Sequence, residues 1–164
     1  MRRVGAPEQQ MLVVQGNLAT AYHMLKRYEL ALGMQRDVYR GTLMLLGEEH
    51  SETLREATNY VCCLLRQNRF EEGKSLMRKT LAAARRVFRE EEDAMLRVRW
   101  VYAMAFYKDA GATLADLRVA VNTLEETERI ARRVLGSAHP TAECIEQALR
   151  ESRAVLRERE TLPG

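Results

Sequence analysis

The sequence predicts an all-α protein, an α-solenoid of antiparallel helix pairs with a C-terminal capping helix. Three observations predict this fold class. The composition favours helices over sheets, since only 6% of the residues are aromatic and only three of 164 are proline. Landmark residues recur at a constant spacing along the chain. Between these landmarks, apolar residues recur with the period of an α-helix.

Subtraction of residue numbers reveals the repeat. Leu12, Leu54 and Leu96 are each 42 residues apart, and the same spacing relates Asn17 to Asn59. Further pairs at this spacing are Gly5 with Gly47, Tyr28 with Phe70, and Ala31 with Gly73. Repeated units of this length, each too small to bury its own apolar faces, are typical of solenoids.

The third repeat is longer than the first two. Beyond Phe106 the spacing rises from 42 to 47 residues, so five residues (47 − 42) are inserted, most simply at 109–116. We therefore expect a single domain over residues 1–164. Its expected parts are repeats at 5–46, 47–88 and 89–135, followed by a capping helix at 140–160.

Each of the first two repeats reads as a pair of helices. The offsets place helices at 8–25 and 29–46 in the first repeat. In the second, Ser51 is the expected N-cap, because a hydroxyl can accept from the free amides of a first turn. A stripe of helical period follows, made by Leu54, Ala57, Val61, Leu64 and Leu65. Asn68 breaks it, and a second stripe at 70–88 predicts the partner helix.

The third repeat and the cap complete the chain. Helices are expected at 92–110 and 114–135, and Thr113 and Asp116 are spaced as a capping box at the start of the second. Gly136 follows as a C-terminal stop, since glycine accepts a left-handed backbone. Pro140 opens the last helix at a position where no amide donor is lost. At the other end, residues 1–4 match the last turn of a helix.

These features resemble tetratricopeptide repeats. In that family an aromatic residue opens the second helix of each pair and a small residue follows three positions later, as Tyr28 and Ala31 do here. Asn17, Leu18, Ala19 and Tyr22 also occupy signature positions of the family's first helix. The resemblance implies a superhelix of helix pairs that acts by binding other proteins.

The longer period is similar to that of the kinesin-light-chain-like subclass. The usual repeat has about 34 residues, whereas this one has 42. The linkers at 46–54 and 135–141 share the subclass pattern of Leu-Gly, two variable residues and a histidine, as in Leu46-Gly47 and His50. This resemblance covers nearly the whole chain, and it carries no implication of association with a motor.

The resemblance also implies a binding groove on the concave side, lined by the first helix of each repeat. The candidate peptide-binding residues at matching positions are Asn17, Arg55, Asn59, Arg66, Arg97, Trp100 and Lys108. Arg55 and Arg97 are one repeat apart, as are Arg66 and Lys108, so each pair is expected to form a column along the groove.

Columns of cations beside an indole ring favour a peptide that carries carboxylates and one aromatic anchor. The side-chain amides of Asn17 and Asn59 could both donate to and accept from such a peptide's backbone. The competing interpretation is that the cations are solvated charges of helix surfaces, that Trp100 packs in the core, and that the asparagines make local hydrogen bonds.

Two other functions stay open. Arg55, Arg66, Arg97 and Lys108, with Trp100 and Tyr107, could instead form a track for single-stranded nucleic acid. The net charge of only +3 argues against that function. Alternatively, the chain is a structural module whose N-terminal end stacks on another array. The oligomeric state and the partner do not follow from the sequence.

The sequence holds no recognisable catalytic, cofactor or metal motif. Cys62 and Cys63 are adjacent and Cys144 is distant, a pattern that indicates buried thiols of a reducing, cytoplasmic protein rather than a disulfide framework or a nucleophile. No phosphate-binding glycine loop and no zinc-type spacing of Cys and His occurs. No apolar run approaches the ~20 residues that span a bilayer. We expect neither an enzyme nor a membrane protein.

Overall fold

The computed structural model describes residues 6–162. Within them the chain forms seven α-helices and no strand, which confirms the predicted fold class. The helices are α1 (Ala6–Met24), α2 (Tyr28–Leu46), α3 (Ser51–Arg66), α4 (Phe70–Val87), α5 (Asp93–Tyr107), α6 (Leu114–Leu135) and α7 (Pro140–Thr161). The predicted helical turn at residues 1–4 lies outside the described residues.

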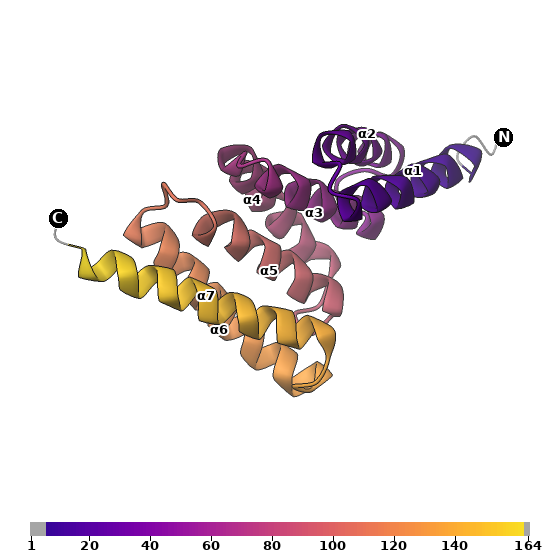
Figure 1. The fold of residues 1–164 in the computed structure, drawn as a ribbon. Coiled ribbons are helices and arrows are strands. Elements are labelled where there is room, and N and C mark those ends of the chain that lie inside the picture. The colour runs from indigo at the N-terminus through magenta and orange to yellow at the C-terminus, as the bar shows by residue number, and fades with distance from the viewer. Residues whose placement is uncertain (1–5, 163–164) are drawn as a thin grey trace.

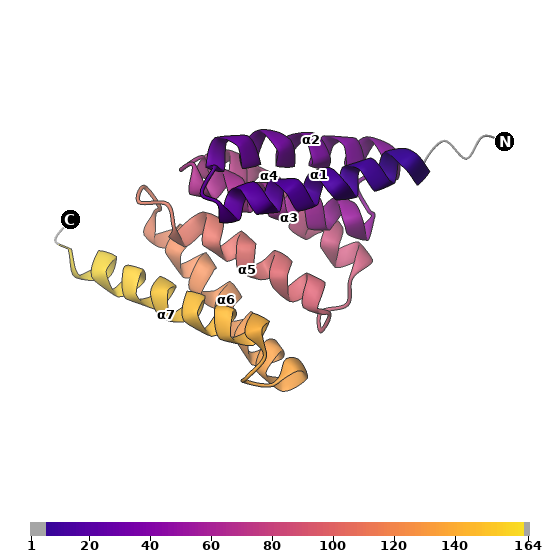
Figure 2. The same cartoon turned by 45° about the vertical axis from the view of Figure 1, so that its right-hand side comes forward.

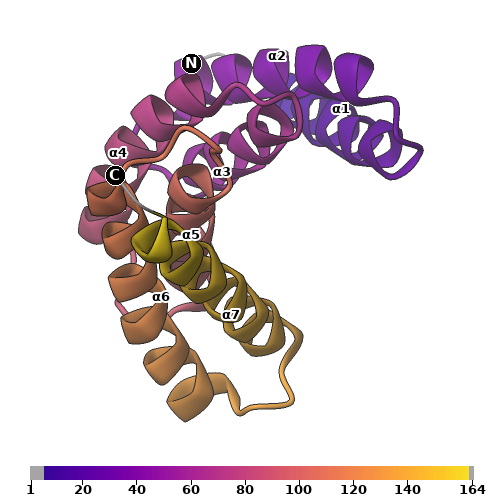
Figure 3. The ribbon, with the colours of Figure 1, turned by 60° about the vertical axis from the view of Figure 1, so that its left-hand side comes forward.

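The helices stack into an arc (Figure 1). Each helix packs against the next one in the chain, and α5 also contacts α3 and α7. Viewed roughly along the helix axes, α1, α3, α5 and α7 line the inner side of the arc, while α2, α4 and α6 form its outer side (Figure 3). Helices α1 and α2 lie at one end and α7 at the other (Figure 2). The inner side is the surface on which the first helices of successive repeats lie beside one another.

The core lies between stacked pairs. All five residues of the stripe predicted in the second repeat are buried on α3, and Leu96 on α5 and Leu117 on α6 are fully buried. Burying such a side chain contributes roughly 1.5–3 kcal/mol. One large apolar cluster runs from α3 to α7. A much smaller one joins α2 to α3 through Ala31, Leu32, Cys63 and Leu64.

Histidines, rather than the predicted serine, cap two of the inner helices. The prediction of Ser51 as the N-cap of α3 is wrong, because His50 has the extended backbone of an N-cap and its Nδ1 accepts from the Glu52 amide at 3.2 Å. His139 caps α7 in the same way, accepting from the Thr141 amide at 3.2 Å. The repeated linker histidine therefore satisfies an amide that the first turn leaves free.

Other helix ends follow the prediction closely. The capping box of Thr113 and Asp116 is present, with both hydrogen bonds at 3.1 Å. Gly136 has a φ of 83°, and Gly47 has a φ of 85° at the corresponding linker. These values lie in the region that favours glycine. Most predicted bounds differ from the observed ones by one or two residues.

The inserted segment differs more. The helix predicted at 92–110 ends at Tyr107 as α5, and a turn follows in which Asp109 Oδ1 accepts from the Gly111 amide at 2.8 Å. The same carboxylate accepts from Lys74 Nζ on α4 at 2.7 Å. Burial of Lys74 opposes its charge, but hydrogen bonds to Asp109 and Glu71 outweigh this effect and raise its pKa. This ion pair fastens the insertion to the neighbouring repeat.

Candidate functional site: the groove of the inner helices

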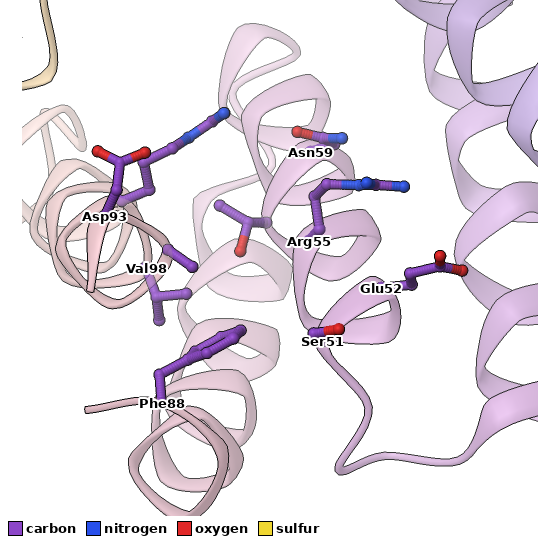
Figure 4. Close-up of a pocket in the computed structure, with 10 residues that line it drawn as sticks. Ser51, Glu52, Arg55, Asn59, Phe88, Asp93 and Val98 are labelled. Atoms are coloured by element: carbon purple, nitrogen blue, oxygen red, sulfur yellow. The ribbon is translucent and has the colours of Figure 1, made fainter. Parts of the chain in front are cut away.

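A pocket of about 270 Å³ opens between α3 and α5 on the inner side of the arc. Figure 4 shows Arg55 and Asn59 on the α3 wall, Asp93 and Val98 on the α5 side, and Phe88 at one end. Its complete lining is Ser51, Glu52, Arg55, Thr58, Asn59, Phe88, Asp93, Ala94, Arg97 and Val98. Three of the seven predicted site residues, Arg55, Asn59 and Arg97, therefore share one pocket.

A buried carboxylate holds the α3 wall in place. Glu56, whose side chain is 9% exposed, accepts from Gln35 of α2 at 2.6 Å and from Arg55 Nε at 3.1 Å. It also accepts from the Asn59 amide at 3.5 Å. The charge of Arg55 is thus partly neutralised by its neighbour in the sequence. Both predicted ligand-binding side chains on this wall are oriented by Glu56.

Arg97 is the more available cation of the pocket. It is exposed, and no ion pair of Arg97 is found within residues 6–162. A guanidinium of this kind can take a carboxylate in two parallel hydrogen bonds. The lining also carries the carboxylates of Glu52 and Asp93, so its two arginines are balanced by two acidic groups. The pocket therefore presents separate positive and negative points rather than a uniformly basic surface.

A second pocket, of about 300 Å³, lies between α5 and α7. Trp100 and Lys108, two further predicted residues, line it with Met104, Tyr107, Glu143, Cys144, Gln147, Ala148 and Glu151. Trp100 is half-buried and packs against the core, as the competing interpretation expected in part. Its Nε1 is buried without a hydrogen-bond partner in the described part of the chain.

Lys108 is engaged within this second pocket. Its Nζ donates to Glu151 of α7 at 2.7 Å, and Glu151 also accepts from Tyr107 Oη at 3.1 Å. The hydrogen bond from Lys108 lowers the pKa of Glu151 against the opposing effect of burial. Burial, together with Glu151, raises the pKa of Tyr107. The three side chains tie α5 to the capping helix, so Lys108 has a structural contact as well as a place beside the indole ring.

Two predicted residues lie outside both pockets. Asn17 is exposed on α1, and Arg66 lies with its guanidinium carbon 5.9 Å from the centre of the Tyr28 ring. Of the two predicted columns of cations, Arg55 and Arg97 lie together, because they line one pocket. Arg66 and Lys108 are instead held by different neighbours, since Lys108 pairs with Glu151.

The sequence interpretation missed Glu56, Phe88 and a pair of polar side chains near α1. Glu56 could have been identified from the sequence. It stands one repeat from Val14 and Val98, at a position that is otherwise apolar. Cys63 Sγ and His23 Nδ1 lie 3.9 Å apart. Burial, and then Cys62, raise the pKa of Cys63 to about 11, while burial and Arg66 lower the pKa of His23. The pair is neutral at neutral pH, without the thiolate that a cysteine nucleophile needs.

Comparison with known proteins identifies the repeat. Residues 12–52 match the family model of the tetratricopeptide repeat. This segment of the chain therefore has the sequence pattern of a tetratricopeptide repeat. No curated protein sequence matches it. Among solved structures, one described as Podosopora anserina putative kinesin light chain nearly identical TPR-like repeats matches with a TM-score of 0.69 at 21% identity, over 91% of this chain and 68% of that one.

A variant of the same Podosopora anserina protein matches with a TM-score of 0.72, at the same identity and coverage. The fold of the chain is therefore similar to that of a kinesin-light-chain-like array of TPR-like repeats, as the 42-residue period indicated. Within residues 6–162 no helix has the length and apolar character that a bilayer crossing requires. The same residues contain no cluster of three or more metal-binding side chains.

Proposed function

We propose that this TPR array is a protein-interaction scaffold that holds an extended peptide segment of a partner along its inner helices. The observation that carries the proposal is the α3–α5 pocket, in which Arg55 and Arg97 from successive repeats flank an apolar surface of Phe88 and Val98. Binding, without catalysis or a cofactor, is the proposed activity.

The pocket defines the chemistry of the peptide. A carboxylate of the ligand pairs with Arg97, which makes no ion pair within the described residues, while Asn59 hydrogen-bonds to the ligand's backbone. An aromatic or large aliphatic side chain lies on Phe88 and Val98. The two carboxylates of the lining select against a polyacidic ligand, so one acidic residue beside an apolar anchor fits better than an acidic run.

The second pocket extends the same surface. Trp100 can form a further apolar contact with the ligand through the exposed part of its ring. The Lys108 charge is shared with Glu151, so this cation is expected to contribute less than Arg97. A peptide that spans both pockets would follow α5 along the inner side of the arc.

A peptide library tests the proposal. Peptides that combine one aspartate or glutamate with a nearby aromatic residue are displayed, and selected sequences are titrated by fluorescence anisotropy. Arg97→Glu should weaken binding by about 10- to 100-fold, because a charge-assisted contact becomes a repulsion. Arg85→Glu, on the exposed surface of α4, is the matched control and should leave binding unchanged.

Two outcomes would reject the proposal. One is the absence of any selected peptide, and the other is equal binding by the wild type and the Arg97→Glu variant. Preference for short single-stranded RNA, with an affinity that falls steeply with salt, would favour the nucleic-acid alternative instead. The balanced charge of the α3–α5 pocket argues against that result.

A further inference from the structure

The end of the array formed by α1 carries an exposed apolar stripe. Met11, Val14 and Leu18 are 61%, 63% and 44% exposed, and Ala21 and Leu25 continue the stripe at helical spacing, with Leu25 71% exposed. Single exposed apolar residues are normal on proteins, but a contiguous stripe along a whole helix marks an interaction surface. None of these residues lines the α3–α5 pocket.

The same stripe is covered in the other repeats. The positions of Met11, one and two repeats on, are Thr53 and Met95, which are 2% and 0% exposed. The positions of Ala21 are Cys63 and Ala105, which are also buried. Helix α2 packs on α3 and helix α4 packs on α5 to cover them. The stripe of α1 therefore has the character of an inter-repeat interface without its covering helix.

Helix α2 extends the apolar surface. Met44 is 89% exposed, whereas Arg86 and Arg133 occupy its position in the other two repeats. Between α1 and α2, a hollow of about 560 Å³ is lined by Pro7, Glu8, Met11, Leu12, Gly41, Met44 and Leu45. Met44 thus stands where the other repeats carry an arginine. Because methionine is enriched at interfaces, this difference favours a contact surface at this end of the array.

We propose that this face binds a second copy of the chain, with the two α1 helices packed antiparallel about a twofold axis near Leu18. Such a pairing sets Met11 against Leu25 of the second copy, and Val14 against its Ala21. Leu18 then meets Leu18 of the second copy at the axis. Consecutive helices of the array, α2 and α3 among them, already pack in this antiparallel manner.

Charge supports the second copy and its orientation. Glu8 is the one formally charged residue in α1, apart from His23 near its end, and Lys26 and Arg27 follow the helix directly. All three charges are exposed, and none has an ion-pair partner within residues 6–162. An antiparallel pair brings Glu8 of each copy to the end of α1 in the other, where the turn carries Lys26 and Arg27. A parallel pair would oppose like charges, which destabilises such a contact.

A dimer needs a contact that extends over both α1 and α2. Met11, Val14 and Met44, with the other exposed apolar residues of this end, form the centre of the proposed contact. A stable dimer buries about 800 Å² on each side. The flanking polar residues of α1 and α2 supply the remainder. A twofold axis gives both copies the same contact, so association stops at the dimer.

Sedimentation equilibrium of the full chain over a wide concentration range tests this proposal. The wild type should form a dimer. Val14→Glu should raise the dissociation constant about tenfold or more, because an unpaired carboxylate would be buried in an apolar contact. Val14 is mostly exposed in the single chain, so the variant should keep the helical circular dichroism of the wild type. Arg97→Glu, in the peptide groove, is the matched control and should dimerise normally.

Charge reversal tests the orientation. Glu8→Lys and Arg27→Glu should each weaken the dimer by opposing like charges, and the double variant should restore it. A monomer at every concentration would overturn the proposal, whatever else covers the face. A dimer that survives Val14→Glu, that Arg97→Glu dissociates, or that the double charge reversal fails to restore would overturn it equally. These results do not test peptide binding by the groove. Peptide binding is measured separately, with the Val14→Glu variant as the peptide's receptor.

Discussion

At the scale of single residues, Glu56 shows how a polar group can organise a groove from within. It replaces an apolar residue of the repeat, and its carboxylate collects hydrogen bonds from Gln35, Arg55 and Asn59. A buried carboxylate is costly unless its oxygens are satisfied. Two of the side chains that satisfy Glu56, Arg55 and Asn59, also line the pocket, so the stability of α3 and the shape of the pocket are linked.

Removal of this carboxylate should therefore destabilise the protein. Glu56→Ala should lower the free energy of unfolding by about 1–3 kcal/mol, since it leaves Gln35 without its acceptor. Glu56→Gln should cost less, because an amide oxygen still accepts. Urea denaturation followed by circular dichroism measures both. Glu91→Ala, at an exposed position, is the control. Equal effects of Glu56→Ala and Glu91→Ala would contradict the assigned role.

Cys63 gives a prediction about pH. Burial raises its pKa from 9.0 to about 11, so the folded protein favours the neutral thiol more than the unfolded chain does. A group with a raised folded pKa contributes stability below the unfolded pKa and loses it as pH rises through the folded value. The free energy of unfolding should thus decrease between about pH 9 and pH 11, and less so in a Cys63→Ala variant. Chemical denaturation across this range is the measurement, and an identical pH dependence in both proteins would contradict it.

The residue scale also shows what the sequence could predict of the site. The 42-residue period placed Arg55 and Arg97 together correctly, because equivalent positions on stacked helices lie beside one another. The period could not predict that Arg66 lies against Tyr28, or that Lys108 pairs with Glu151. Long cations choose among several neighbours, and that choice depends on side chains from other helices. Whether any of the seven predicted residues binds a peptide stays a prediction.

At the scale of elements, most of the fold was predictable. Helices, linkers and the capping box follow from local patterns that the stacking does not change. Two helix ends differ from the prediction. At the start of α3, His50 has an extended backbone and takes the N-cap position, so Ser51 is the first helical residue. The other exception is the end of α5. There the Asp109 turn and its ion pair to Lys74 replace a last helical turn.

This ion pair links two repeats, and its loss should be measurable. Asp109→Asn keeps an acceptor for the Gly111 amide but removes the charge that faces Lys74. We expect a loss of roughly 1–3 kcal/mol, because Lys74 is buried and retains only Glu71. The hydrogen bond from Lys74 lowers the pKa of Asp109. Its stabilisation is therefore present above the unfolded pKa and is lost as pH falls. The free energy of unfolding of the wild type should therefore fall as the solution is acidified. The free energy of unfolding of Asp109→Asn should fall less over the same pH range.

At the scale of the whole molecule, the array is uneven. The large apolar cluster extends from α3 to α7, while α1 and α2 are joined to the rest through the small cluster around Leu32 and Leu64. Stability in repeat proteins is close to a sum of repeat and interface terms. The first repeat has an interface on one side only in the single chain, so it should open more readily than the repeats behind it.

Hydrogen exchange with mass spectrometry tests this gradient at a low protein concentration, where the proposed dimer dissociates. Amides of α1 and α2 should exchange faster than those of α3 to α6. Leu32→Ala should cost about 2–5 kcal/mol locally and accelerate exchange in α1 and α2. Leu117→Ala removes a fully buried side chain of the large cluster and should accelerate exchange from α3 to α7. Uniform protection across all seven helices, or a global effect of Leu32→Ala, would mean that the array unfolds as one cooperative unit. The apolar stripe of α1 would then rest on a rigid platform rather than on the repeat that opens first.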